Sequence, residues 1–237
     1  MLWKCYILHK RLTRAINLYR KVYPNAKQDV FAPIQYQAYY LDPTAPRNKP
    51  GVPIQVKMAE KIRCDPYDDK VCMMQDRLEQ VGKADGINFS RESKIGCTRD
   101  AHRLVQFARK KQAEGWAGKL KRGEGEDAKL DLGLEHEVLG HLFYLYFEGG
   151  GDITSREMLA SAAEKAGLDP VEAREWLDSA EDKGGSEVDA EVEEAVRKGV
   201  MGVPVLYIND SIEVDGAQDV EFLMEQFIKI KKAEATV

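Results

Sequence analysis

The spacing of hydrophobic positions changes several times along the chain, and each change predicts a different element. In residues 6–22, apolar side chains recur at intervals of three and four with Lys and Arg between them, which predicts an amphipathic helix. From Ile34 to Tyr40, apolar and aromatic residues alternate with polar ones, and this alternation predicts a strand. The proline-rich stretch at 42–53 predicts a loop.

Between residues 54 and 198 the spacing is helical. Start signals support this interpretation, since Thr154 to Glu157 has the form of a capping box and Asp169-Pro170 that of an N-cap with a first-turn proline. A glycine-rich, charged stretch at 115–133 predicts a mobile loop. The predicted helices lie near 73–82, 98–111, 135–147, 154–167, from 169 onward, and 187–198.

Strand spacing returns near the end of the chain. The run VPVLYIN at 203–209 predicts a fully buried strand, and SIEV at 211–214 predicts a second strand joined to it as a hairpin. A last amphipathic helix is predicted at 217–231. Because an isolated hairpin is only marginally stable, we expect the strands from both ends of the chain to share one sheet.

This order of elements predicts an α/β fold with a large all-helical insertion. Residues 1–53 and 199–237 are expected to form one discontinuous domain that contains the sheet. Residues 54–198 are expected to form the helical insertion.

Composition and charge argue against several classes of protein. Apolar residues make up 43% of the chain and charged residues 32%, which is typical of globular proteins. The formal net charge of −5 does not favour nucleic-acid binding. No apolar run reaches the length of a membrane span, and the first residues lack the apolar core of a secretory signal. The cysteines, at positions 5, 64, 72 and 97, show neither C-x-x-C nor zinc-finger spacing, so we expect reduced thiols and a cytoplasmic location.

Several strings, among them CYILHKRLTRAI at 5–16 and GVMGVPVLYIN at 199–209, resemble segments of the DsbA-like thioredoxin-fold oxidoreductases, in their FrnE-type branch. CYILHKRLTRAI resembles the start of that family's first helix, and CTRDAHRLVQFA at 97–108 resembles its N-T-x-x-A-H-R-L helix. LFYLYFEGGGDITSREMLASAAEKAGLD at 142–169 resembles a helix pair of the family, and GVMGVPVLYIN at 199–209 resembles its cis-proline segment. The order and spacing of these strings imply a thioredoxin-like sheet and thiol–disulfide exchange chemistry.

The chain departs from the family's pattern at the C-P-W-C motif. Aligned without gaps, that motif falls on residues 2–5, so that Leu2 replaces the first cysteine and Cys5 matches the second. The first strand of the thioredoxin sheet has no counterpart in the sequence. We therefore expect a truncated or alternatively started form of the family, in which the strands at 30–41 and 203–209 lack their shared neighbour.

Cys5 is the predicted catalytic residue. A thiol at a helix N-terminus with basic neighbours favours the thiolate, so we expect a lowered pKa for Cys5. The resemblance implies that Trp3, Val203, Pro204 and His102 lie on the substrate side, with a cis bond before Pro204. For His102, a purely structural hydrogen-bonding role is the alternative.

The resemblance also implies the reaction partners. Small-molecule or protein thiols are the expected substrates, with glutathione as a co-substrate rather than a bound cofactor. Neither nucleic-acid nor membrane partners are expected, and a homodimer is compatible with the family. No metal site is predicted, because His136 and His141 in HEVLGH are five residues apart and not on one helical face.

Two further functions fit the same architecture. Kappa-class glutathione transferases and related isomerases use a serine near the first-cysteine position, where this chain has Leu2. A non-catalytic binding domain would have kept the fold and lost the thiols, and Leu2 favours this alternative.

Overall fold

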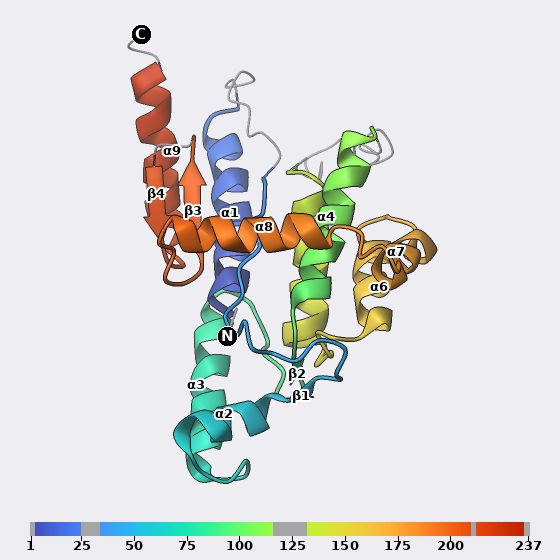
Figure 1. Ribbon diagram of the computed structural model, residues 1–237. Coiled ribbons are helices and arrows are strands. Elements are labelled where there is room, and N and C mark those ends of the chain that lie inside the picture. Colours follow the sequence, from blue (N-terminus) through green and yellow to red (C-terminus); the bar gives the residue numbers. More distant parts are fainter. Residues whose placement is uncertain (1–2, 25–33, 116–131, 210–211, 235–237) are drawn as a thin grey trace.

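The computed structural model describes residues 3–24, 34–115, 132–209 and 212–234 (Figure 1). Helix α1 stands beside a hairpin of two strands and helix α9, and a second group of helices lies on its other side. Helix α8 runs across both groups. The elements in chain order are α1 (Trp3–Val22), β1 (Val52–Pro53), α2 (Ile54–Ile62), α3 (Asp69–Ala84), β2 (Lys94–Ile95), α4 (Arg99–Ala113), α5 (Leu134–Phe143), the π-helix η2 (Tyr144–Glu148), α6 (Arg156–Lys165), α7 (Pro170–Asp178), α8 (Gly185–Arg197), β3 (Val205–Ile208), β4 (Ile212–Asp215) and α9 (Val220–Glu234).

The predicted helices are confirmed, and their capping residues explain where they begin. Ser155 caps α6 by accepting a hydrogen bond from the backbone N–H of Met158, so the cap lies one residue after Thr154. Asp169 caps α7, and Pro170 occupies its first turn. The predicted loop at 115–133 lies almost entirely outside the described residues.

The C-terminal hairpin is confirmed, but its first strand is not fully buried. Strands β3 and β4 pair antiparallel, with Leu206 opposite Val214 and Ile208 opposite Ile212. The prediction of a fully buried strand was wrong, since Val205, Leu206 and Ile208 are half-buried and Tyr207 is 46% exposed. Among the described residues β3 has a strand neighbour on one side only, which leaves its other side uncovered.

The strand predicted at 34–40 is absent from the described sheets. This segment is extended, and its burial alternates as the sequence suggests, but it joins no ladder. Its backbone N–H groups bond instead to the carbonyl of Leu132 and to the carboxylates of Glu135 and Glu191. A small ladder that the sequence did not predict pairs β1 with β2, so the loop predicted at 42–53 ends in a strand.

Two hydrophobic clusters surround α1. The larger joins Tyr6 and Ile7 of α1 to buried side chains of α4, α5, α6 and α7. The smaller packs the rest of the buried face of α1, from Leu8 to Tyr19, against Leu223 and Phe227 of α9. The first cluster therefore contains residues from both predicted domains, and the division at 53 and 199 stays a prediction.

Burial in the larger cluster predicts how strongly a core substitution lowers the free energy of unfolding. Leu104 is fully buried in α4, so Leu104→Ala is expected to lower the free energy of unfolding by about 2–5 kcal/mol through lost transfer energy and a cavity. Leu18→Ala is the control, since Leu18 on α1 is 44% exposed and its loss should cost less than about 1 kcal/mol. Urea unfolding of both variants measures the difference, and equal losses would contradict the assigned core.

Candidate functional site

Cys5 lies in the first turn of α1, where its side chain packs against the larger cluster. The residue is half-buried, and Trp3 of the same turn packs against the same cluster. The ammonium group of Lys4 lies 5.7 Å from the centre of the Trp3 ring. Trp3 and Cys5 therefore lie in the same turn of α1, and both pack against the larger cluster.

The predicted activation of Cys5 was wrong. Burial raises the pKa of the Cys5 thiol to about 12, and the opposing hydrogen bond from its own backbone is a smaller effect. The free-energy cost of removing the thiolate from water is larger here than the stabilisation that the helix N-terminus provides. At neutral pH the group is a protonated, weakly nucleophilic thiol.

The Val203–Pro204 peptide bond is cis. Pro204 is buried, and its carbonyl accepts a hydrogen bond of 2.9 Å from the N–H of Gly216. The next residue, Ala217, packs against both clusters, and its carbonyl accepts a bond from Arg11 of α1. This chain of contacts connects the proline turn to the helix that carries Cys5.

His102 belongs to a different neighbourhood from Cys5. Its ring lies in α4 next to Tyr40, with 5.9 Å between ring centres, and is hydrogen-bonded to the backbone of Tyr39. Burial lowers the pKa of His102 to about 4, and its Nε2 atom is buried with no partner among the described residues. The His102 ring is therefore neutral and lies against the segment 34–40, beside Tyr39 and Tyr40.

A polar network that the sequence did not predict lies between α1, α5 and the segment 34–40. The rings of His9 and His136 stack with 4.0 Å between their centres. Tyr36 bonds to Nδ1 of His136 at 2.7 Å, and Thr13 bonds to Nε2 at 2.9 Å. The only sequence signal for this network was the polar pair His9 and Thr13 near the apolar face of α1.

The hydrogen bonds determine the tautomer of His136. The Thr13 hydroxyl donates its single hydrogen to the carbonyl of His9, so it accepts from Nε2–H of His136. Nδ1 of His136 is then the acceptor for the Tyr36 hydroxyl. Burial lowers the pKa of His136 to about 2 and that of His9 to about 4, so both rings are neutral.

Arg109 fastens the segment 34–40 to the helices. Its guanidinium bonds to Glu135 of α5 at 2.9 Å, to Glu191 of α8 at 2.5 Å and to the carbonyl of Tyr36 at 2.7 Å. The same two carboxylates accept the N–H groups of Tyr36 and Ala38. Charged side chains thus hold the segment 34–40 against α5 and α8.

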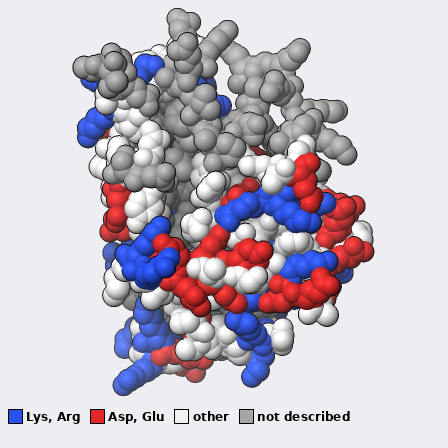
Figure 2. All heavy atoms as spheres, turned by 45° about the horizontal axis from the view of Figure 1, so that its top comes forward, with Lys and Arg blue, Asp and Glu red and all other residues white. Residues whose placement is uncertain are grey.

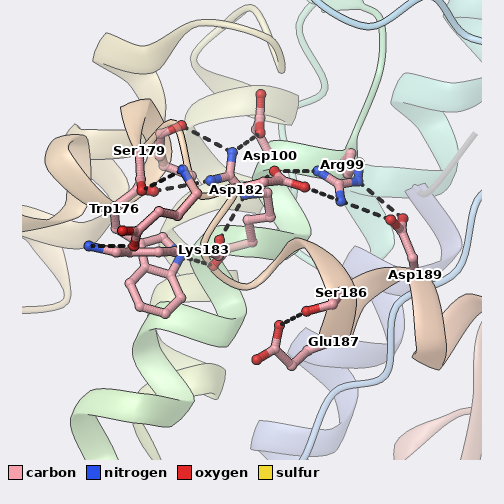
Figure 3. Close-up of polar contacts among 12 residues, drawn as sticks. Arg99, Asp100, Trp176, Ser179, Asp182, Lys183, Ser186, Glu187 and Asp189 are labelled. Carbon is pink, nitrogen blue, oxygen red and sulfur yellow. Dashed lines mark hydrogen bonds and ion pairs between the residues drawn. The ribbon is translucent and has the colours of Figure 1, made fainter.

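A second arginine joins α4 to the start of α8 (Figure 3). The side chain of Arg99 is 7% exposed and lies between Asp182 and Asp189, with bonds of 2.7 and 2.8 Å. Both hydrogen bonding and charge from Arg99 lower the pKa of each aspartate. Figure 2 shows acidic and basic side chains interspersed over one face of the molecule, without a large patch of one sign.

No group of three His, Cys, Asp or Glu side chains in the described residues is placed to hold a metal ion. The described cysteines form no disulfide, and the half-buried Cys97 lies near Tyr40 rather than in the cluster of Cys5. No helix within the described ranges is long and apolar enough to cross a bilayer.

Comparisons with known proteins agree with this architecture. The DSBA-like thioredoxin domain matches residues 128–227 of the chain. A probable DsbA oxidoreductase from Streptomyces coelicolor is similar in structure, with a TM-score of 0.69 and 22% sequence identity over 96% of this chain and 84% of that one. A search of curated proteins found no match to the sequence.

The comparisons identify the fold of the chain. The chain has the thioredoxin-like DsbA fold, an α/β architecture with a helical insertion. Within that fold it carries a thiol, Cys5, in the first turn of α1.

Burial of Cys5 predicts slow alkylation. Because each unit by which a thiol pKa rises removes about nine-tenths of the thiolate, Cys5 should react with iodoacetamide at pH 7.5 at least about 100-fold more slowly than an ordinary thiol. Peptide mass spectrometry against the exposed Cys72 measures this ratio within one sample. Equal rates would show that Cys5 is accessible.

The neutral histidines predict a loss of stability in mild acid. The pKa values of His9 and His102 fall from 6.5 to about 4 on folding, so the unfolded chain takes up protons that the fold excludes. Stability is therefore complete above pH 6.5 and declines as pH falls toward 4, by about 1.4 kcal/mol per pH unit for each histidine.

Urea unfolding between pH 7 and pH 5 tests this dependence, because most carboxylates titrate at lower pH. His102→Gln should reduce the slope by about 1.4 kcal/mol per pH unit. An unchanged slope would mean that His102 is protonated in the fold.

Long-range nitrogen–proton NMR spectra should show His136 with its hydrogen on Nε2.

Proposed function

We propose that this chain carries out thiol–disulfide exchange of the DsbA type, with Cys5 as a single thiol of low reactivity. The observation that carries the proposal is the position of Cys5 in the first turn of α1 in a DsbA-like fold. The similar chain from Streptomyces coelicolor is described as a probable DsbA oxidoreductase, which supports this class of reaction. Assignment to the FrnE-type branch rests on the sequence strings and belongs to the same proposal.

The exchange reaction needs only one thiol in each step. The Cys5 thiolate attacks one sulfur of a disulfide, a new S–S bond forms, and the other half of the substrate leaves as a thiolate. A second thiol, such as glutathione, then attacks the mixed disulfide and releases Cys5. Without a partner thiol three residues away, the protein does not close its own disulfide at this site.

Burial makes this exchange slow at neutral pH. The thiolate fraction of Cys5 rises about tenfold per pH unit until the pKa near 12 is reached, so the rate should rise in the same way. Small disulfides and exposed cystines in proteins are the substrates that this proposal allows.

The test is formation of a mixed disulfide with glutathione disulfide. Reduced protein is incubated between pH 7 and pH 10, and peptide mass spectrometry follows glutathione on Cys5. We expect an adduct whose rate rises with pH and which Cys5→Ser abolishes, while the adduct on Cys72 persists. If no adduct forms on Cys5 at any pH, the proposed exchange is wrong.

A substitution at position 2 sharpens the test. Leu2→Cys creates C-x-x-C spacing with Cys5, and oxidised protein should then contain a disulfide and accelerate insulin reduction by dithiothreitol. Leu2→Ser is the matched control and should lack both properties.

A non-catalytic binding role is the second candidate, and the burial of Cys5 favours it. A thiol with a pKa near 12 contributes little to redox chemistry at neutral pH, while its packing against the larger cluster remains useful. This role predicts that Cys5→Ala lowers the free energy of unfolding through lost packing, and that the protein shows no thiol-dependent turnover.

A further inference from the structure

Cys5 and His9 lie one turn apart on the same face of α1. Residues four apart on a helix have Cβ atoms about 5–6 Å apart, and helical side chains lean toward the helix N-terminus. The side chain of His9 therefore leans toward the turn that carries Cys5. Tyr36 lies beside both residues, and its ring centre is 6.4 Å from that of His9. Burial raises the pKa of the Tyr36 hydroxyl, and the charges on Glu135 and Cys5 raise it further, which places the thiol near the same ring.

One nitrogen of the His9 ring is buried without a hydrogen-bond partner. Nε2 lies 3.1 Å from the carbonyl of His136, and because a carbonyl only accepts, Nε2 carries the ring hydrogen. Burial lowers the pKa of His9 to about 4, so the ring is neutral and Nδ1 has a free lone pair. No described residue donates a hydrogen bond to this atom. A buried acceptor without a donor is rare in proteins and points to a ligand at that place, an ion or a water molecule.

The neighbours of His9 fix the position of its ring. The ring stacks on His136 with 4.0 Å between centres and meets Phe143 edge-on at 5.9 Å. Gly140 of α5 leaves room for it, since a Cβ atom at that position would lie 2.9 Å from Cε1 of His9. Both nitrogens of His136 are already hydrogen-bonded, so the free lone pair of this stacked pair is the one on Nδ1 of His9.

The two donors suit a soft metal ion that needs few ligands. Metal-binding histidines commonly donate their second ring N–H to a backbone carbonyl, as His9 does to His136. A thiolate such as that of Cys5 selects soft ions, among them Cu(I). Zinc in structural sites takes a full tetrahedral set of ligands, and the described residues hold no group of three His, Cys, Asp or Glu placed for a metal. Cu(I) and Ag(I) accept as few as two donors.

Charge balance supports the same kind of ion. Burial opposes a charge on either residue alone, because it raises the pKa of the Cys5 thiol and lowers that of the His9 ring. A thiolate, a monovalent cation and a neutral imidazole together carry no net charge, so their burial costs less than that of a single ion. A divalent ion on the same donors would leave a positive charge uncompensated.

We propose that Sγ of Cys5 and Nδ1 of His9 together bind a Cu(I) ion. On binding, the S–H bond of Cys5 breaks, a sulfur–copper bond forms, and the proton passes to the solvent. The His9 ring donates its lone pair and keeps its hydrogen on Nε2. Copper stays monovalent throughout, so no oxidant or reductant takes part. Cys5 is half-buried, and the ion reaches the thiol from its exposed side.

The inference goes beyond the proposed exchange reaction and shares only Cys5 with it. Metal binding is measured on fully reduced protein without any disulfide, and the exchange reaction is measured with a Cu(I) chelator present. Failure of the exchange reaction therefore leaves the metal site unaffected, and failure of metal binding leaves the exchange reaction unaffected.

The test is competition for Cu(I) between the protein and the coloured chelator bicinchoninate, without oxygen. The parent protein is the full chain with Cys64→Ser, Cys72→Ser and Cys97→Ser, because other accessible thiols would add background binding. We expect the parent to bind one ion per chain, and Cys5→Ser in the same background should abolish this binding.

Substitutions of His9 distinguish a metal ligand from a packing residue. His9→Gln keeps a donor for the His136 carbonyl but removes Nδ1, so affinity for Cu(I) should fall at least about tenfold. His9→Met supplies a soft thioether instead and should recover part of this loss. His102→Gln is the matched control, since it removes another buried, unpartnered ring nitrogen that lies in a different neighbourhood from Cys5. It should change the affinity by less than about twofold.

Ag(I) provides a test that needs no variant of His9. In long-range nitrogen–proton NMR spectra of the parent protein, the Nδ1 resonance of His9 should shift when Ag(I) is added. The ring resonances of His102 should stay in place. This measurement keeps the inference falsifiable if the His9 variants do not fold.

Three results would overturn the inference. They are absence of Cu(I) binding that depends on Cys5, equal affinity of the folded His9→Gln protein, and an Nδ1 resonance of His9 that does not move with Ag(I) bound. Binding that depends on Cys5 but not on His9 would mean a thiol-only contact, with a water molecule as the partner of Nδ1.

Discussion

The guanidinium of Arg109 is the contact on which the arrangement of the segment 34–40 depends. It bonds two carboxylates that come from α5 and α8, and each carboxylate also accepts a backbone N–H of the segment. Glu135 is almost fully buried, with 3% of its side chain exposed, so its charge requires a partner. Without Arg109, two carboxylates would be left near each other and the carbonyl of Tyr36 would lose its donor.

The chemistry of Cys5 follows from the same cost of burying charge. A helix N-terminus stabilises an anion by roughly 0.3–1 kcal/mol at an exposed site. Burial against the larger cluster acts in the opposite direction and is the larger effect, as it is for the neutral rings of His9 and His136. Where α1 packs against α5, the fold therefore favours neutral groups, and the buried carboxylate of Glu135 is paired with the guanidinium of Arg109.

Local signals in the sequence predicted the helices well, because caps and periodic spacing act within a few residues. Asp169 and Pro170 mark the start of α7 in the sequence as they do in the structure. The hairpin of β3 and β4 was predicted for the same reason. The DsbA-like fold was predicted from the resemblance of several sequence strings to that family, and not from the spacing of hydrophobic residues.

What the sequence could not predict depends on contacts between distant residues. The pKa of Cys5 is raised by burial against the larger cluster, whose side chains come from distant parts of the chain, so the local basic residues suggested the wrong direction. The network of Tyr36, His136 and Thr13 joins three segments that lie far apart in the chain. The pattern HEVLGH excluded a zinc motif but gave no sign that His136 would stack on His9.

Alternation of apolar and polar residues predicts which side chains are exposed more reliably than it predicts that the backbone joins a β-ladder. In residues 34–38 the even-numbered residues are the more buried ones, as the pattern requires, yet their backbone N–H groups at 36 and 38 bond to carboxylates. In β3 an apolar run that is typical of a buried strand is half-exposed, because its ladder has one side. An unpaired N–H that is withdrawn from water costs on the order of 1–3 kcal/mol, so these carboxylates take the place of a ladder for the N–H groups of Tyr36 and Ala38.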